Sequence, residues 1–200
     1  MRIYKIIKNT SVEGPGKRFC IWVQGCSRHC RGCFAKETWD FSAGKEYNVQ
    51  NIYAMIKSQK GIEGVTFLGG EPFEQVNELY ELSKLIKKHN LSIVCFTGYR
   101  IEDLMSKNNR TINQFLANID LLIDGEFKEE KIDFTRPWIG SSNQRYIFLS
   151  DRYKESEIMK YRNKIEMHIY PDGEVLVNGM GNFDLIEKKL SLQPSKNNVK

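Results

Sequence analysis

The chain has 200 residues, of which 40% are hydrophobic and 28% charged, with a net charge of +5 at pH 7. No apolar run approaches the roughly 20 residues that cross a bilayer, and the polar start MRIYKIIKNT is not typical of a signal peptide. The basic residues are scattered, which gives little support to nucleic-acid binding. We therefore expect a cytoplasmic protein that folds as one domain, with no direct nucleic-acid partner and no membrane partner.

Strand and helix patterns alternate along the first two thirds of the chain. Runs of β-branched and aromatic residues bounded by turn residues predict strands at 2–7, 18–24, 65–68, 91–96 and 119–123. Apolar residues with helical spacing predict a helix after Asn48, a second at 74–89 and a third at 101–117, broken near Asn108.

The last third of the chain has weaker patterns. Residues 126–144 are irregular, 145–149 predict a strand, and 165–170 with 174–177 predict a β-hairpin around Pro171-Asp172-Gly173. We expect residues 151–200 to be an extension of the domain that ends in a frayed polar tail. The hairpin is expected to form an outer edge of the sheet, remote from the cysteines described below; the alternative is that it closes over a compact small-molecule pocket.

The alternation of strands and helices predicts right-handed βαβ units around a parallel sheet. In such folds ligands gather where the strands end. Four loops, at 25–34, 69–73, 97–99 and 124–126, should therefore converge, and they contain most of the chemically unusual residues.

Three of the five cysteines, Cys26, Cys30 and Cys33, form a Cys-x3-Cys-x2-Cys motif. Three thiolates can hold three corners of an iron–sulfur cube and leave the fourth iron open to a ligand. A zinc site with His29 as fourth ligand is the alternative, but His29 lies between two of the ligands. Cys20 and Cys95 lie in apolar runs and are predicted to be core residues.

Residues around this motif fit a cluster site. Gly32 lets the backbone approach the cluster, and Arg28 and Arg31 are expected to offset the thiolate charge. The second loop, LGGEPF, places Gly69, Gly70 and Glu71 at a strand end. Two glycines there permit close approach to a ligand, and the Glu71 carboxylate can accept a hydrogen bond from a ligand ammonium group.

The chain resembles the radical S-adenosylmethionine superfamily and, within it, the activases of glycyl-radical enzymes that serve anaerobic ribonucleotide reductase. The likeness rests on EGPGKRFCIWVQGCSRHCRGC, FAKETWDF, TFLGGEPF, FTGY, LLIDGEF and GSSNQR, in order over residues 3–150. It implies an α/β fold, a partial (β/α) barrel of radical S-adenosylmethionine type with a C-terminal β-hairpin extension.

The resemblance implies a [4Fe–4S] cluster on Cys26, Cys30 and Cys33 and S-adenosylmethionine on its open iron. Reductive cleavage of S-adenosylmethionine would give a 5′-deoxyadenosyl radical, which removes a hydrogen from a glycine Cα. No catalytic side chain beyond these groups is expected. The implied contacts to S-adenosylmethionine are Gly32, Phe34, Gly69, Gly70, Glu71, Thr97, Asp124, Ser142, Asn143 and Arg145.

The implied partners are an anaerobic ribonucleotide reductase or another glycyl-radical enzyme, and a flavodoxin-like or other low-potential electron donor. Two alternatives stay open. The chain could be a radical enzyme that modifies a peptide or small molecule with help from its C-terminal segment, or a non-catalytic iron–sulfur or zinc protein.

Overall fold

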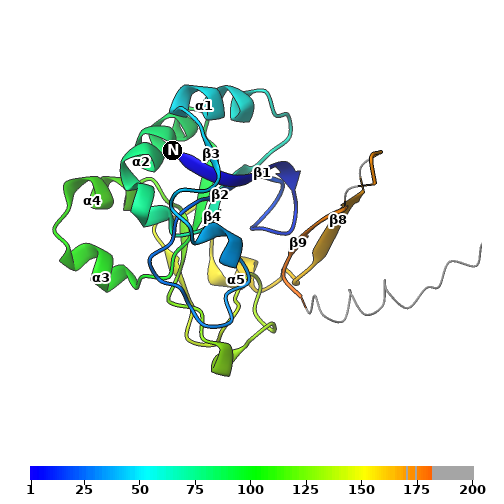
Figure 1. Ribbon diagram of the computed structural model, residues 1–200. Helices are drawn as coiled ribbons and strands as arrows, with labels where there is room; N and C mark the ends of the chain where they lie inside the picture. The colour runs from blue at the N-terminus through cyan, green and yellow to red at the C-terminus, as the bar shows by residue number, and fades with distance from the viewer. Residues whose placement is uncertain (170, 174, 182–200) are drawn as a thin grey trace, which may run out of the picture.

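A seven-stranded sheet in the order β3-β1-β2-β4-β5-β6-β7 forms the centre of the computed structural model, which describes residues 1–169, 171–173 and 175–181 (Figure 1). Four neighbouring strands are parallel: β2 (Arg18–Val23), β4 (Gly64–Gly69), β5 (Ser92–Phe96) and β6 (Leu121–Asp124). The flanking strands β1 (Arg2–Thr10), β3 (Lys45–Glu46) and β7 (Arg145–Phe148) are antiparallel to their neighbours. The predicted parallel sheet is confirmed, while the short strand β3 was not predicted.

Helices connect the parallel strands. They are α1 (Val49–Lys57), α2 (Val76–Lys87), α3 (Ile101–Ser106) and α4 (Arg110–Leu116), and a short α5 (Glu155–Ile158) that was not predicted follows β7. Single 3-10 turns lie at η1 (Lys36–Thr38), η2 (Pro72–Gln75) and η3 (Glu129–Lys131). Asn48 caps α1 as predicted, because its side-chain oxygen accepts a hydrogen bond from the Asn51 amide at 2.7 Å. The predicted break falls at Asn108, which has a φ of 48°.

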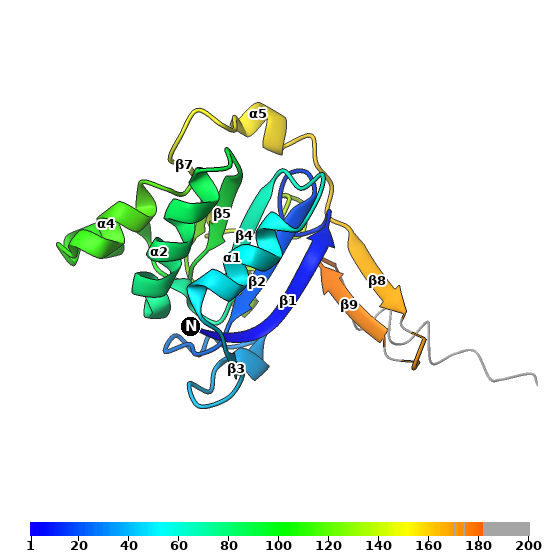
Figure 2. The same ribbon diagram turned by 90° about the horizontal axis from the view of Figure 1, so that it is seen from above.

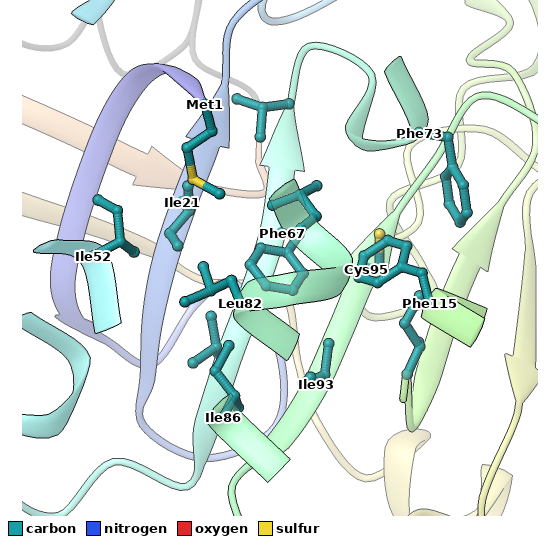
Figure 3. Close-up of a cluster of buried hydrophobic side chains, with 14 of the residues drawn as sticks. Met1, Ile21, Ile52, Phe67, Phe73, Leu82, Ile86, Ile93, Cys95 and Phe115 are labelled. Atoms are coloured by element: carbon teal, nitrogen blue, oxygen red, sulfur yellow. The ribbon is translucent and has the colours of Figure 1, made fainter. Parts of the chain in front are cut away.

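The main hydrophobic core lies between the helices and one face of the sheet. Figure 3 shows Phe67 of β4 and Ile93 of β5 beside Leu82 and Ile86 of α2, and all four side chains are fully buried. Residues that alternate along each strand face this core, as the period of a β-strand requires. Cys95 belongs to the same core, which confirms its predicted structural role.

The opposite face of the sheet carries a smaller cluster that includes Cys20, Trp22 and Leu68. Within the described part of the chain, no long helix covers this face. Instead, Trp138 and Ile139 of the irregular segment and Ile158 of α5 pack over β5 and β6. Strand β2 is buried along its whole length because both of its faces are covered.

The C-terminal hairpin consists of β8 (Ile165–Ile169) and β9 (Val175–Gly179), which pair as a separate two-stranded sheet. The hairpin is therefore not an edge of the main sheet, and that expectation is wrong. Figure 2 shows it beyond β1, on the side away from α2. Glu166 fixes it to the end of β1, accepting hydrogen bonds from the Thr10 hydroxyl at 2.5 Å and the Ser11 amide at 2.9 Å. The predicted frayed tail lies outside the described residues.

None of the helices among the described residues is long and apolar enough to span a bilayer.

Candidate functional site

The four loops at the ends of the parallel strands meet, as predicted. Backbone hydrogen bonds join the glycine loop after β4 to the end of β2, from the Gly70 amide to the Val23 carbonyl at 2.8 Å and from the Glu71 amide to the Gly25 carbonyl at 2.9 Å. Because Gly25 immediately precedes Cys26, the glycine loop is tied directly to the base of the cysteine loop.

The Glu71 side chain extends this connection to β5. Its carboxylate, 1% exposed, accepts hydrogen bonds from the Thr97 hydroxyl and the Gly98 amide at 2.8 Å each, and from the Phe73 amide at 3.0 Å. Burial raises the pKa of Glu71 to about 7. The carboxylate is thus a structural acceptor between two loops, although the sequence suggested an acceptor for a ligand ammonium group.

The chain of contacts continues to β6. The Thr97 amide donates to the Ile123 carbonyl at 2.9 Å, and the Gly125 amide donates to the Tyr99 carbonyl at 3.0 Å. We call this set of hydrogen bonds, from Val23 through Glu71 and Thr97 to Gly125, the strand-end network. It holds the four predicted loops as one unit.

The cysteine loop is closed at its base. The Gly25 amide donates to the Thr38 carbonyl at 2.7 Å and the Cys26 amide to the Trp39 carbonyl at 3.2 Å. The Gln24 side chain reinforces the closure by donating to the carbonyls of Glu37 at 3.0 Å and Asp40 at 2.8 Å. The three thiols therefore sit on a loop whose two ends are fixed to each other.

The environment of the thiols fits an iron–sulfur cluster. Backbone amides approach each sulfur: those of Arg28 and His29 at Cys26, that of Phe127 at Cys30, and that of Ala35 at Cys33, the last at 3.4 Å. Such amides stabilise cluster thiolates.

The chain alone keeps the first two thiols protonated. Burial raises the pKa of Cys26, and burial and then the nearby Glu126 carboxylate raise the pKa of Cys30 to about 11. Since the ligand is the thiolate, binding of iron has to displace these protons. Among the described residues no three His, Cys, Asp or Glu side chains already form a metal-binding arrangement.

The charged residues of the loop face carboxylates. Arg31 pairs with Glu129 at 2.9 Å and Arg28 with Glu126 at 3.5 Å, so the two arginines do not simply offset thiolate charge as expected. His29 stacks on Trp39, with ring centres 4.6 Å apart. This stacking argues against His29 as a zinc ligand.

Two glycines are required by backbone packing. A Cβ on Gly69 would lie 2.7 Å from the Trp22 backbone, and one on Gly70 would lie 2.4 Å from the Gly25 carbonyl oxygen. Gly32 has a φ of 73°, a conformation that other residues rarely adopt. These glycines let neighbouring loops come close together. The sequence predicts instead that they let a ligand come close to the backbone.

The polar residues near β6 that were predicted to contact S-adenosylmethionine form hydrogen bonds within the protein. Asp124 is fully buried and accepts hydrogen bonds from Arg145 at 2.6 and 2.9 Å and from the Ile101 amide at 2.9 Å. Asn143 donates to the Glu126 carbonyl at 2.8 Å, while Ser142 is exposed and its amide donates to Lys131 at 2.7 Å. Asn143 and Arg145 line a separate pocket of about 470 Å³ beside Arg28.

A second pocket, of about 290 Å³, lies on the face of the sheet opposite α1 and α2. Its lining includes Cys33, Phe34 and Gly69, and also Lys5, Glu13 and residues 177–180. We call it the hairpin pocket. It joins three predicted site residues to a part of the chain that the sequence placed far from them.

Comparison with known proteins identifies the family. A family model described as "4Fe-4S single cluster domain" matches residues 12–147, a range that includes all three loop cysteines. The anaerobic ribonucleoside-triphosphate reductase-activating protein of Pasteurella multocida is 34% identical over 66% of this chain and 88% of its own length, and that of Haemophilus influenzae 33% identical over the same shares. The chain belongs to this activating-protein family.

The radical S-adenosylmethionine chemistry expected from the sequence is thus confirmed at the level of the family, with a [4Fe–4S] cluster and S-adenosylmethionine as cofactors. QueE of Escherichia coli shows a partial structural likeness, with a TM-score of 0.40 and 23% identity over 48% of this chain and 52% of QueE. The activating-protein family explains the loop cysteines, but hairpin β8–β9 lies outside the matched residues 12–147.

The sequence did not assign a role to several residues of the hairpin pocket. Glu13 is part of the SVEGPG motif, yet nothing indicated that its side chain is buried against the hairpin. Trp22 and Phe96 alternate with core residues along their strands, and that alternation was the available signal that they face the other side. Asn178 follows a short apolar run and carried no signal at all.

Proposed function

We propose that this protein activates an anaerobic ribonucleotide reductase by removing a hydrogen atom from a glycine Cα of that enzyme. The observation that supports this most directly is the closed cysteine loop, with three thiols near backbone amides, fixed to the glycine loop at the ends of the parallel strands. The names of the relatives point to the same reductase as partner. A flavodoxin-like or other low-potential protein would supply the electron.

In this proposal Cys26, Cys30 and Cys33 hold the cluster. When bound there, the cluster and S-adenosylmethionine would supply a one-electron reductive cleavage of the S–C5′ bond that yields methionine, and the 5′-deoxyadenosyl group would take up the glycine hydrogen as 5′-deoxyadenosine. Phe34 and Gly69 would contact S-adenosylmethionine, since they line the pocket that Cys33 reaches.

The remaining predicted contacts have different parts in this proposal. Glu71, Thr97 and Asp124 keep the strand ends in place through their internal hydrogen bonds. Gly32 and Gly70 allow close backbone approach. Asn143 and Arg145 line the separate pocket of about 470 Å³ and, with the neighbouring Ser142, would act on the cofactor only at its edge. The face of the sheet opposite α1 and α2 would form the interior of a partial barrel.

The test separates loop cysteines from strand cysteines. Anaerobically reconstituted wild-type protein should hold about four irons and, once reduced, release 5′-deoxyadenosine from S-adenosylmethionine. Cys30→Ala should lose the cluster, whereas Cys20→Ala is the matched control and should keep it, because Cys20 is fully buried in the sheet. A full cluster in Cys30→Ala would contradict the ligand assignment.

The partner is tested by electron paramagnetic resonance on a mixture with the anaerobic reductase from the same organism. A glycyl-radical signal that requires both proteins, S-adenosylmethionine and reductant is the expected result. A second candidate, modification of a free peptide or metabolite, is favoured by the compact hairpin pocket of about 290 Å³. Turnover of such a molecule, with no glycyl radical on an active reductase, would select this second function.

A further inference from the structure

The residue before the second loop cysteine has an unusual backbone conformation. His29 has a φ of 46°, in the left-handed region. Within residues 26–33, all of which the structure describes, only Gly32 also has a positive φ. A residue with a side chain adopts this conformation at a cost in free energy, so it persists only where neighbouring contacts hold it. The contacts of His29 therefore show what keeps this part of the cysteine loop in place.

Trp39 touches the cysteine loop at two points. Its indole ring stacks on the His29 imidazole, with ring centres 4.6 Å apart and an angle of 22° between the planes. Its backbone carbonyl accepts a hydrogen bond from the Cys26 amide at 3.2 Å. Trp39 belongs to the stretch FAKETWDF, which carries the family resemblance but contains no cysteine. One residue outside the motif thus fixes the positions of both Cys26 and His29.

Two successive backbone amides point at one sulfur in this part of the loop. Those of Arg28 and His29 both donate to the Cys26 sulfur. Successive N–H groups next to a left-handed residue form a concave site that binds anions, and such sites occur around iron–sulfur clusters. The Arg28 side chain is held separately, by Glu126 at 3.5 Å and by the Tyr99 ring, whose centre lies 4.8 Å from the guanidinium carbon. The direction of the two amides therefore depends on how His29 is held on the other side.

We propose that stacking between Trp39 and His29 aims two backbone amides at the Cys26 sulfur and thereby raises the reduction potential of the cluster. This inference rests on the proposed function only in that Cys26 is a cluster ligand. Reduction adds negative charge to the cluster, so N–H groups that donate to its sulfur ligands stabilise the reduced state more than the oxidised state. Trp39 and His29 are therefore positioning residues, which act on the cluster through the backbone amides.

The experiment measures the midpoint reduction potential of the reconstituted full-length protein, at one fixed pH and without S-adenosylmethionine, by a redox titration followed by electron paramagnetic resonance. His29→Ala and Trp39→Leu each remove the stack. Each should lower the potential by about 59 mV, which is a tenfold change in a one-electron equilibrium and the size expected for one hydrogen bond to a charged group. The double variant should show no larger shift than either single variant, because both substitutions remove the same contact.

Two further variants separate the stack from other effects. His29→Phe keeps an aromatic ring beside Trp39 and has no titratable group, so it should keep the wild-type potential. His89→Ala is the matched control, since His89 also contacts an aromatic ring, that of Tyr53 at 5.6 Å between ring centres, and it should leave the potential unchanged. Additive shifts in the double variant would overturn the proposal, as would a wild-type potential in Trp39→Leu or a His29→Phe shift as large as that of His29→Ala.

A second measurement uses the metal-free protein, so it applies even to a variant that binds no cluster. Amide hydrogen exchange at Arg28 and His29 should be about tenfold faster in Trp39→Leu than in the wild type, because the stack keeps both amides directed at the sulfur. The Ile93 amide, which donates to Asp120 at 2.8 Å near the start of β5, should exchange at the wild-type rate if the fold is intact. Unchanged exchange at Arg28 and His29 in this folded variant would also contradict the proposal.

Failure of the proposed function has a different signature. If the cluster-loaded wild type releases no 5′-deoxyadenosine from S-adenosylmethionine with any reductant, the radical chemistry fails whatever the potentials of the variants. If the wild type releases it and the variants keep the wild-type potential, only the role of the stack is wrong. Where the potential is lowered as expected, a stronger chemical reductant should restore 5′-deoxyadenosine release in Trp39→Leu, which it would not do for a misfolded site.

Discussion

The two faces of the central sheet are built in different ways. The face under α1, α2 and α4 is closed by amphipathic helices and holds an almost purely apolar core. The opposite face is closed by an irregular segment, the short α5 and a hairpin, and it contains buried polar groups such as Glu13, Arg18 and Asn178. The first face gives the fold its stability, whereas the second contains the pocket that reaches Cys33.

Arg18 illustrates the difference. It is fully buried on β2 and donates hydrogen bonds to neutral acceptors, among them the Thr66 hydroxyl at 2.6 Å and the carbonyls of Val65 at 2.6 Å and Pro15 at 3.0 Å. Polar side chains of this kind fix loops by hydrogen bonds, which depend on direction. Apolar packing under the helices has no such requirement. Substitutions on the two faces should therefore differ in the property that they change, stability or the position of loops, as well as in the size of the effect.

The largest loss of stability is expected on the helix-covered face. Phe67→Ala removes a fully buried ring that contacts Phe115, with ring centres 5.9 Å apart. The cavity should lower the free energy of unfolding by about 3–5 kcal/mol, measured by urea denaturation. The folded fraction should still bind four irons, because the residue faces away from the cysteine loop; loss of the cluster from fully folded protein would contradict the separation of the two faces.

A smaller but more specific loss is expected in the strand-end network. Glu71→Ala leaves the Thr97 hydroxyl and the amides of Phe73 and Gly98 without their acceptor. This should cost roughly 1–3 kcal/mol of stability and also weaken S-adenosylmethionine binding, measured by equilibrium dialysis. Glu71→Gln keeps an acceptor oxygen and should restore part of both. Normal cofactor affinity in a destabilised Glu71→Ala protein would show that the network serves the fold alone.

The sequence predicted the strands and the helices on the helix-covered face well. Periodic apolar residues located α1, α2 and the parallel strands, and Asn48 and Asn108 marked a helix start and a break. These signals are local, since they depend on residues within one or two turns. The convergence of the four loops followed from a general property of parallel sheets.

The opposite face of the sheet depends on contacts between segments that lie far apart in the sequence. Asn178 meets Thr10 across 168 positions, and Glu166 meets the same threonine across 156. No periodic pattern signals such pairs, and the hairpin was accordingly misplaced. Two donors to the Glu71 carboxylate, Thr97 and Gly98, likewise come from another strand end, so no local pattern indicates these internal hydrogen bonds.

The pH dependence of stability offers a third test. Burial is the main cause that raises the pKa of Glu13 to about 7, from an ordinary value of 4.5. Between these two values the folded state binds more protons than the unfolded state, so stability should fall as the pH rises through this window. Glu13→Gln should remove roughly 1–3 kcal/mol of that decline, measured by denaturation at pH 4.5 and pH 8. Glu71 contributes a decline of the same sign, so the variant should flatten the profile only in part.

The smallest effect is expected at the exposed edge of the strand-end region. Arg145 donates to Glu102 at 2.8 and 3.0 Å and also to the buried Asp124. The hydrogen bonds from Arg145 lower the pKa of Glu102 to about 2, but solvent screens this pair. Glu102→Gln should therefore change the free energy of unfolding little, whereas Asp124→Asn should cost more because it breaks the buried half of the same interaction. Denaturation of both variants at low and at high salt is the measurement. The Glu102 effect should shrink with salt and the Asp124 effect should persist. Equal losses would mean that exposure does not separate the two halves of this interaction.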